Sequence, residues 1–225
     1  MKKIVIILYG PPGSGKGTQA NLLAQKLNLI HFDTGRLLES ILHDPARQKE
    51  ATIKHMRELF DTGILVTPSF VLREVAKDVR RIRKADWGIV FSGSPRTLYE
   101  AKGLYPVLEK LYGKKNVFIV ELLAPPSSSI RRNSARLICK ECGYIVLTAF
   151  YPAKKTGHCP ICGGTFYSRS LDKPEIIKVR LEEYKKRTFP IIDFVKKRGY
   201  KVFAVDARPA PYKVLEKILK DLKMK

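Results

Sequence analysis

Short apolar runs alternate with longer amphipathic segments along most of the chain. The apolar runs have the length of buried strands, and the first of them is apolar at every position from 4 to 8, as in a strand covered on both faces. Strands and helices in this alternation predict an α/β fold, with a parallel sheet and helices on both of its faces. The predicted strands are 4–9, 30–32, 88–91, 117–122 and 201–205, and the predicted helices are 15–27, 35–42, 46–61, 69–83, 99–112, 127–136, 174–198 and 211–222.

Two blocks do not fit the alternation. A mostly helical block at 35–67 comes before the strand predicted at 88–91. A second block at 137–168 carries all four cysteines and has the pattern of short β-hairpins around a metal. The sequence therefore predicts one core that is interrupted by two smaller parts.

Length and composition narrow the class of protein. The chain has 225 residues, 44% of them hydrophobic, which suffices for a packed core and excludes a disordered basic tail protein. The apolar run at 4–9 is too short to span a bilayer or to form the core of a secretion signal, so we expect a cytoplasmic protein without membrane contact. Lys and Arg number 43 against 21 Asp and Glu, and the net charge of +22 points to anionic partners such as nucleotides or RNA.

A glycine-rich segment, Gly-Pro-Pro-Gly-Ser-Gly-Lys-Gly-Thr-Gln at 10–19, follows the first predicted strand and opens the first predicted helix. The glycines allow a tight turn whose backbone N–H groups point at phosphate oxygens, and Lys16 adds a mobile cation. The usual motif has Ser or Thr directly after the lysine, whereas here Gly17 stands there and Thr18 follows. This context predicts a phosphate-binding loop that holds ATP through Gly13, Ser14, Gly15, Lys16, Gly17 and Thr18.

The loop variant resembles that of the adenylate kinase branch of the nucleoside monophosphate kinases, and the segments 33–38, 63–67 and 93–97 are similar to that family's monophosphate-binding motifs. The resemblance implies a P-loop NTPase-type parallel five-stranded sheet flanked by helices. It implies a core at 1–136 and 169–225, a monophosphate-binding insert at 34–67 and a zinc-binding lid at 137–168. The expected activity is transfer of the ATP γ-phosphoryl group, with Mg²⁺, to a nucleoside monophosphate, most simply AMP to give two ADP. We expect a monomer.

The resemblance also implies a set of site residues. Transfer between two nucleotides gathers many phosphate charges, and arginine suits them because its planar guanidinium binds phosphate through two hydrogen bonds and stays charged. The implied catalytic residues are Lys16, Arg96, Arg132, Arg136, Arg169 and Arg180, and Arg132 and Arg208 are also implied to bind ATP. The implied monophosphate site consists of Thr34, Gly35, Arg36, Ile64, Leu65, Val66, Gly93, Arg96 and Glu100.

Several positions depart from the family's pattern. Glu39 stands where the family usually has an arginine for the acceptor phosphate, and Arg36, one turn earlier, is the candidate to reach that phosphate instead. Ser92 replaces an aspartate that holds Mg²⁺ through water, and Ser94 replaces an aromatic residue.

Glu100 replaces the glutamine that reads adenine. A carboxylate only accepts hydrogen bonds, which favours the N–H donors of guanine, although it can still accept from the adenine amino group. The departures leave four readings open: AMP as acceptor, another acceptor base (GMP or CMP/UMP), a paralogue of low kinase activity, and a Glu100 that is simply an exposed helix residue.

The cysteines form two Cys-x2-Cys pairs, each followed by glycine, with sixteen residues between the pairs: Cys139, Cys142, Cys159 and Cys162. In a chain without an export signal, this spacing favours a structural Zn²⁺ site over free or disulfide-bonded cysteines. Many bacterial-type members of the resembled family carry such a metal site in the lid, between the same arginines. Basic and aromatic residues interleaved around a zinc ribbon also suit RNA, so a nucleotide-gated RNA- or ribosome-associated binding protein is the alternative.

Overall fold

The computed structural model describes residues 3–146 and 157–224. Its centre is a parallel five-stranded sheet in the order β2-β3-β1-β4-β8. Every residue of β1 is buried, which explains why this run is apolar throughout. The predicted α/β fold with five parallel strands is confirmed. The strands are β1 (Val5–Tyr9), β2 (Ile30–Phe32), β3 (Ile89–Phe91), β4 (Val117–Leu123) and β8 (Val202–Asp206).

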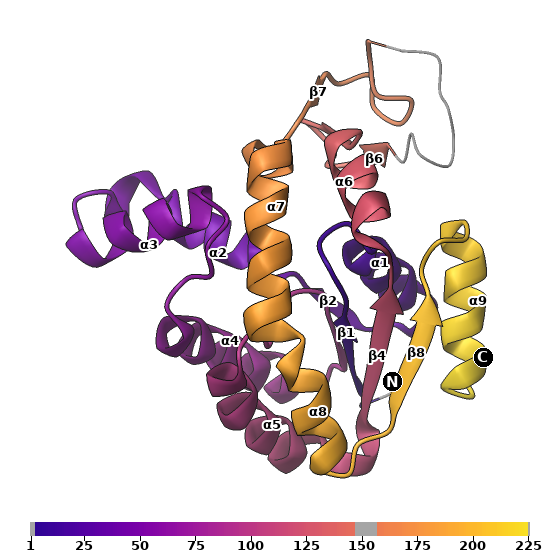
Figure 1. Cartoon of the computed structure of the whole chain (residues 1–225). Coiled ribbons are helices and arrows are strands. Elements are labelled where there is room, and N and C mark those ends of the chain that lie inside the picture. The colour runs from indigo at the N-terminus through magenta and orange to yellow at the C-terminus, as the bar shows by residue number, and fades with distance from the viewer. Residues whose placement is uncertain (1–2, 147–156, 225) are drawn as a thin grey trace.

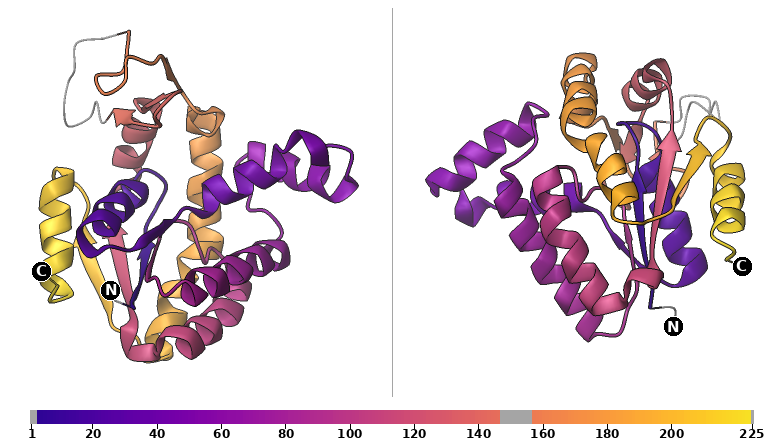
Figure 2. Two further views of the ribbon diagram at one scale, coloured as in Figure 1. Left: turned by 180° about the vertical axis from the view of Figure 1, so that it is seen from behind. Right: turned by 60° about the horizontal axis from the view of Figure 1, so that its bottom comes forward.

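Each face of the sheet has its own hydrophobic core, because successive residues of a strand point to opposite faces. Val5 and Ile7 of β1 belong to one core, and Ile6 and Leu8 belong to the other. Figures 1 and 2 show the two helical layers on either side of the sheet. The first core packs against α4 (Pro68–Lys84), α5 (Leu98–Tyr112) and α8 (Pro190–Lys197), and the second against α1 (Lys16–Leu27) and α9 (Pro211–Asp221).

The helix predicted at 174–198 is interrupted. It is built as α7 (Pro174–Glu183), a π-helical turn at Tyr184–Thr188, and α8. Pro190 has no N–H and its ring collides with the carbonyl four residues earlier in a regular helix. The chain widens ahead of it, so that the Phe189 N–H donates to the Tyr184 carbonyl at 2.8 Å, five residues back.

The helix predicted at 46–61 is also shorter than expected. A 3₁₀ turn at Pro45–Arg47 comes first, with the Asp44 carboxylate accepting from the Ala46 N–H, and α3 (Ala51–Asp61) begins four residues later. The Gln48 amide between them donates to the carbonyls of Leu42 and Asp44. This side chain satisfies backbone groups that a continuous helix would have satisfied itself.

Two parts project from the core near the carboxyl ends of the strands (Figure 1). The first, called the helical arm below, consists of α2 (Thr34–Leu42) and α3. The second, called the cysteine sheet, is a three-stranded antiparallel sheet in the order β6-β5-β7 that lies in the chain between α6 (Pro126–Ser134) and α7. The limits that the sequence suggests for insert and lid stay a prediction. The strands of the cysteine sheet are β5 (Leu137–Cys139), β6 (Ile145–Val146) and β7 (Phe166–Tyr167).

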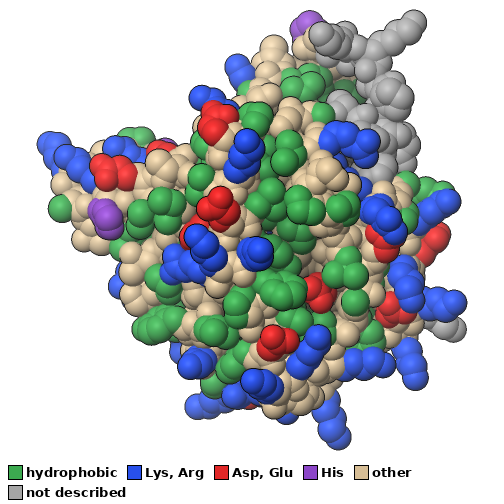
Figure 3. Space-filling view, viewed as in Figure 1, with side chains coloured by type: hydrophobic (Ala, Val, Ile, Leu, Met, Phe, Trp, Pro, Cys, Tyr) green, Lys and Arg blue, Asp and Glu red, His purple; other side chains and the backbone are tan. Residues whose placement is uncertain are grey.

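Positive charge is spread over the surface. In Figure 3, Lys and Arg side chains are scattered among apolar and acidic ones and form no continuous stripe on the face shown. Among the helices that the structure describes, none has the length and apolar character needed to cross a bilayer. The net charge of +22 therefore does not mark a single basic groove on this face.

Candidate active site

A cavity opens at the carboxyl ends of β1 and β3, between the core, the helical arm and the cysteine sheet. In open parallel sheets this edge is where ligands bind, because the loops that follow the strands converge there. The cavity is lined by the phosphate loop, by α2 and the segment after α3, by the loop after β3, by β6 and by α7. Segments far apart in the sequence thus share one site.

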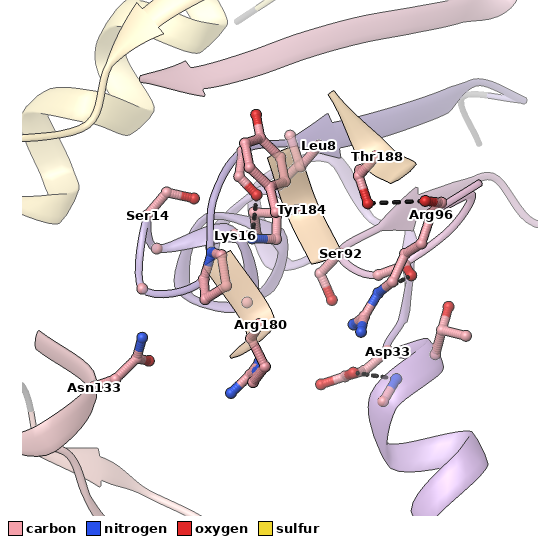
Figure 4. Close-up of a pocket in the computed structure, with 18 of the residues that line it drawn as sticks. Leu8, Ser14, Lys16, Asp33, Ser92, Arg96, Asn133, Arg180, Tyr184 and Thr188 are labelled. Atoms are coloured by element: carbon pink, nitrogen blue, oxygen red, sulfur yellow. Dashed lines mark hydrogen bonds between the residues drawn. The ribbon is translucent and has the colours of Figure 1, made fainter. Parts of the chain in front are cut away.

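The phosphate loop has the geometry that its glycines predict. Gly13 and Gly15 have φ of +76° and +89°, a left-handed backbone that residues with a Cβ rarely adopt. Lys16 begins α1, and its Nζ donates to the carbonyls of Gly10 at 2.7 Å and Pro11 at 2.8 Å. The ammonium group is therefore held inside the loop, as Figure 4 shows, at the N-terminal end of a helix where anions are favoured.

Four basic side chains repel one another around this cavity. Burial, followed by the charges of Arg96, Arg180 and Arg136, lowers the pKa of Lys16 well below its ordinary value. Burial and the same mutual repulsion lower the pKa of Arg180 to about 9. Such an arrangement is costly without an anion, and phosphate groups are of the charge and kind that would offset it.

Asp172 organises two of these arginines. Its side chain is only 3% exposed and accepts from Arg136 Nε at 2.8 Å and Arg136 Nη2 at 2.5 Å. Arg180 Nη1 lies 3.9 Å from the same carboxylate and donates to the Leu171 carbonyl at 3.1 Å. Local sequence gives no signal for this role, because one of the partners is 36 residues away.

Arg96 and Gly93 lie together as the motif predicts. Arg96 Nε donates to the Gly93 carbonyl at 2.7 Å, and the Thr188 hydroxyl donates to the Arg96 carbonyl at 2.8 Å. Burial lowers the pKa of the Arg96 guanidinium. In Figure 4 the free end of this guanidinium points into the cavity, on the same side as Asp33.

Glu100 has a clear role within its own helix. Thr97 caps α5, and the Glu100 carboxylate accepts from the Arg96 N–H at 2.9 Å and from the Thr97 hydroxyl at 3.0 Å. This reciprocal arrangement closely resembles a capping box. Glu100 is 3% exposed, so it is not the exposed helix residue that one reading proposed, and burial raises its pKa. Both oxygens already have donors from the chain, although the residue also lines the cavity.

Glu39 and Arg169 form an ion pair between the helical arm and the segment that follows the cysteine sheet. Arg169 Nη2 donates to Glu39 Oε2 at 3.0 Å. The Glu39 side chain is 47% exposed and that of Arg169 is 20% exposed. Glu39, which stands where the family usually has an arginine, thus forms an ion pair with Arg169, and the sequence did not predict this contact.

Three of the predicted arginines do not belong to the group of basic side chains around Lys16. The Arg132 guanidinium donates to the carbonyls of Ala207 at 2.8 Å and Arg208 at 3.0 Å, which ties α6 to the loop after β8, and Arg132 lines the cavity. Arg36 and Arg208 are largely exposed and are not among the residues that line the cavity. Arg208 instead pairs with Asp206 at 2.8 Å. The phosphate role of Arg36 and the nucleotide role of Arg208 stay predictions.

The remaining predicted monophosphate residues line the cavity from the arm side. Asp33 caps α2 by accepting from the Gly35 N–H at 3.0 Å, and Thr34 is buried. After α3, the Leu65 N–H donates to Glu183 at 3.2 Å. Ile64 is 40% exposed and Val66 is buried, so this segment offers both an apolar wall and backbone groups to a ligand.

Ser92 is oriented by a histidine that sequence reasoning missed. His31 Nε2 lies 2.7 Å from Ser92 Oγ, and His31 Nδ1 lies 2.5 Å from Asn21 Oδ1. Since an amide oxygen only accepts, Nδ1 donates to Asn21 and Nε2 accepts from the Ser92 hydroxyl. Burial lowers the pKa of His31, which favours this neutral form. The lone pairs of Ser92 Oγ are thereby left for other partners in the cavity.

The four cysteines converge as their spacing predicts. Their Sγ atoms all lie within 4.8 Å of one another, with Cys139 and Cys162 at 3.5 Å and Cys142 and Cys159 at 3.7 Å. These distances exclude disulfide bonds, which need about 2.05 Å. A tetrahedral zinc site with Zn–S bonds of about 2.3 Å requires sulfur atoms about 3.8 Å apart. The cluster therefore fits a four-thiolate metal site.

A strand, a glycine-rich loop and a helix that present a lysine beside converging arginines define a P-loop phosphotransferase that acts on nucleotides. A family model described as adenylate kinase matches residues 8–200. The chain belongs to the adenylate kinase family.

Similar proteins cover nearly the whole chain. An adenylate kinase of Caldicellulosiruptor bescii is 38% identical over 88% of this chain and 90% of that protein. One of Methanothrix thermoacetophila is 40% identical over 86% of this chain and 87% of that protein, and one of Archaeoglobus fulgidus is 32% identical over 97% and 99%. These findings do not favour a kinase with another acceptor base or an RNA- or ribosome-associated binding protein.

Proposed function

We propose that the chain catalyses the reversible transfer of the ATP γ-phosphoryl group to AMP, giving two ADP. The observation that carries this proposal is the convergence of Lys16, Arg96, Arg136 and Arg180 on one cavity beside the phosphate loop, where burial and, after it, the charges of Arg96 and Arg136 lower the pKa of Arg180 to about 9. The phosphate groups of ATP and AMP, brought together there, would relieve the repulsion between these side chains. Phosphoryl transfer asks the protein mainly for positioning and charge stabilisation, which these side chains can provide.

AMP is the acceptor that we favour. The Glu100 carboxylate is engaged by the Arg96 N–H and the Thr97 hydroxyl, so its identity is explained by helix capping without a change of base. The relatives are named adenylate kinases, which agrees with AMP. ATP and AMP as substrates, a cytoplasmic location and action as a monomer are parts of this proposal.

Two metals belong to the proposal. Mg²⁺ bound with ATP neutralises phosphate charge, and Thr18, Asp33 and Ser92, which line the cavity, offer the hard oxygen donors that it prefers. Zn²⁺ would be held by the four cysteines and would keep the cysteine sheet folded, because a part of this size has little apolar surface of its own. The cysteine sheet would then cover the donor phosphates and exclude water as a competing acceptor.

A coupled assay of ADP formation with ATP and each of AMP, GMP, CMP and UMP tests the proposal. We expect the highest kcat/KM with AMP, and a loss of about a hundredfold or more in Lys16→Met, because one preorganised charge at the transferring group is removed. Lys26→Met, an exposed lysine at the other end of α1, is the matched control and should keep full activity.

Circular dichroism must show that both variants are folded. A Lys16→Met variant with wild-type turnover would contradict the role of the loop, and turnover of GMP, CMP or UMP above that of AMP would contradict the assignment of the acceptor.

A further inference from the structure

Helix α6 packs directly on the phosphate loop. A Cβ atom at Gly13 would lie 2.7 Å from Asn133 Nδ2 and 2.7 Å from the Ser129 carbonyl, so only glycine allows this approach. Arg132, next to Asn133, ties the same helix to the Ala207 carbonyl at 2.8 Å. The Asn133 side chain is therefore held against the loop by a fixed backbone.

The Asn133 amide is buried but lacks a hydrogen-bond acceptor. Asn133 is 2% exposed, and its Nδ2 has no partner among residues 3–146 and 157–224. Buried donors in folded proteins are nearly always paired, because an unpaired one gives up its bonds to water without replacement. Asn133 also lines the cavity, and Figure 4 shows its amide directed toward the loop, on the opposite side of the cavity from Asp33 and Arg96.

We infer that Asn133 Nδ2 donates a hydrogen bond to an oxygen of the donor nucleotide as it enters the phosphate loop. This inference rests on the proposed function, since it takes the loop to hold ATP. The neutral Asn133 amide offers a hydrogen bond of defined direction, whereas the lysine and the arginines supply positive charge. Its position fits an oxygen acceptor that lies beside Gly13, which a phosphate or a ribose of the donor can provide. Asn133 is thus a further binding residue for the donor.

Nucleotide binding to the full chain, measured by calorimetry with ATP, with AMP and with inorganic tripolyphosphate, tests the inference. Asn133→Ala should raise the Kd for ATP by about tenfold or more where the acceptor is a charged phosphate oxygen, and by about three- to tenfold where it is a neutral ribose oxygen. The Kd for AMP should change by less than about twofold. The thermal midpoint without ligand should be equal or higher, because alanine suits a helix better and removes an unpaired buried amide.

Two further variants sharpen the result. Ser129→Ala is the matched control, since Ser129 is also buried with an unpaired hydroxyl on α6 but is not among the residues that line the cavity, and it should leave ATP binding unchanged. Asn133→Asp keeps the shape of the side chain and, because a carboxylate cannot donate, should weaken ATP binding at least as much as Asn133→Ala.

The comparison of ATP with tripolyphosphate identifies the oxygen that accepts the hydrogen bond from Asn133. Equal weakening of ATP and tripolyphosphate binding assigns a phosphate oxygen, and weakening of ATP binding alone assigns a ribose oxygen. An unchanged Kd for both ligands in folded Asn133→Ala would overturn the inference. Because the readout is binding, a chain that fails to phosphorylate AMP still gives a clear answer on Asn133, so failure of the inference and failure of the proposed function are separate results.

Discussion

Replacing Asp172 by asparagine removes a carboxylate that holds two arginines of the site. The Asp172 carboxylate accepts two hydrogen bonds from Arg136, at 2.8 and 2.5 Å, and faces Arg180 at 3.9 Å. In Asp172→Asn the shape is kept, but the two positive charges face each other without this anion. Burial and basic neighbours already lower the pKa of Arg180 to about 9, so removing the Asp172 charge further destabilises the charged form of this arginine.

The expected cost follows from burial. Removing one partner of a fully buried ion pair costs about 3 to 5 kcal/mol, because the other charge is left uncompensated. The side chains of Arg136 and Arg180 are 23% and 22% exposed, so solvent screens part of the remaining repulsion. We therefore expect Asp172→Asn to lower the free energy of unfolding by about 2 to 4 kcal/mol.

Urea unfolding at neutral pH, followed by circular dichroism, measures this loss. The matched control is Asp221→Asn in α9, because Asp221 pairs with Lys217 one turn away at 2.6 Å, on the surface and far from the site. We expect that variant to lose less than about 0.5 kcal/mol. A similarly small decrease in the free energy of unfolding in both variants, with an unchanged slope of this free energy against urea concentration, would refute the conclusion that Asp172 holds the two arginines together.

Two other predictions concern pH and metal. Arg198, and after it Tyr200, donates a hydrogen bond to the Glu109 carboxylate and lowers its pKa. The ionised carboxylate therefore stabilises the fold above the ordinary glutamate pKa of about 4.3. This contribution is lost as the pH falls through the lowered pKa that Glu109 has in the folded chain. As the pH is lowered from about 4.3, the free energy of unfolding in urea should therefore decrease less steeply in Glu109→Gln than in the wild type. The same pH dependence of this free energy in both proteins would contradict the prediction. Removal of zinc by a chelator should lower the thermal midpoint and turnover together, with recovery when zinc is added back, since the cysteine sheet has little other support. Metal analysis should find about one zinc per chain in the wild type and less in Cys142→Ser, and a chelated chain that keeps its midpoint would contradict a structural metal.

Much of the fold and part of the site follow from local pattern. The strand at 4–9, the glycine-rich loop and the start of α1 are contiguous in the sequence, so their periodicity and motif predict both structure and position. The two cysteine pairs predict their own convergence for the same reason, because ligand spacing is a local property. Helix ends were less predictable where a proline or a side chain competes for backbone hydrogen bonds, as at Pro190 and Gln48.

The side-chain partners that lie far apart in the sequence were decided by the tertiary structure alone. Glu100 shows the limit of this rule from the other side, because its contacts with the Arg96 N–H and the Thr97 hydroxyl are only four and three residues away, and the Thr-x-x-Glu spacing at 97–100 is itself a helix-capping signal. Asp172 meets Arg136, and Asn133 lies against Gly13, across distances in sequence that no periodicity encodes. The physical reason is that hydrophobic pattern and backbone preference act between near neighbours, whereas charge, burial and hydrogen bonding depend on which groups the completed fold brings into contact.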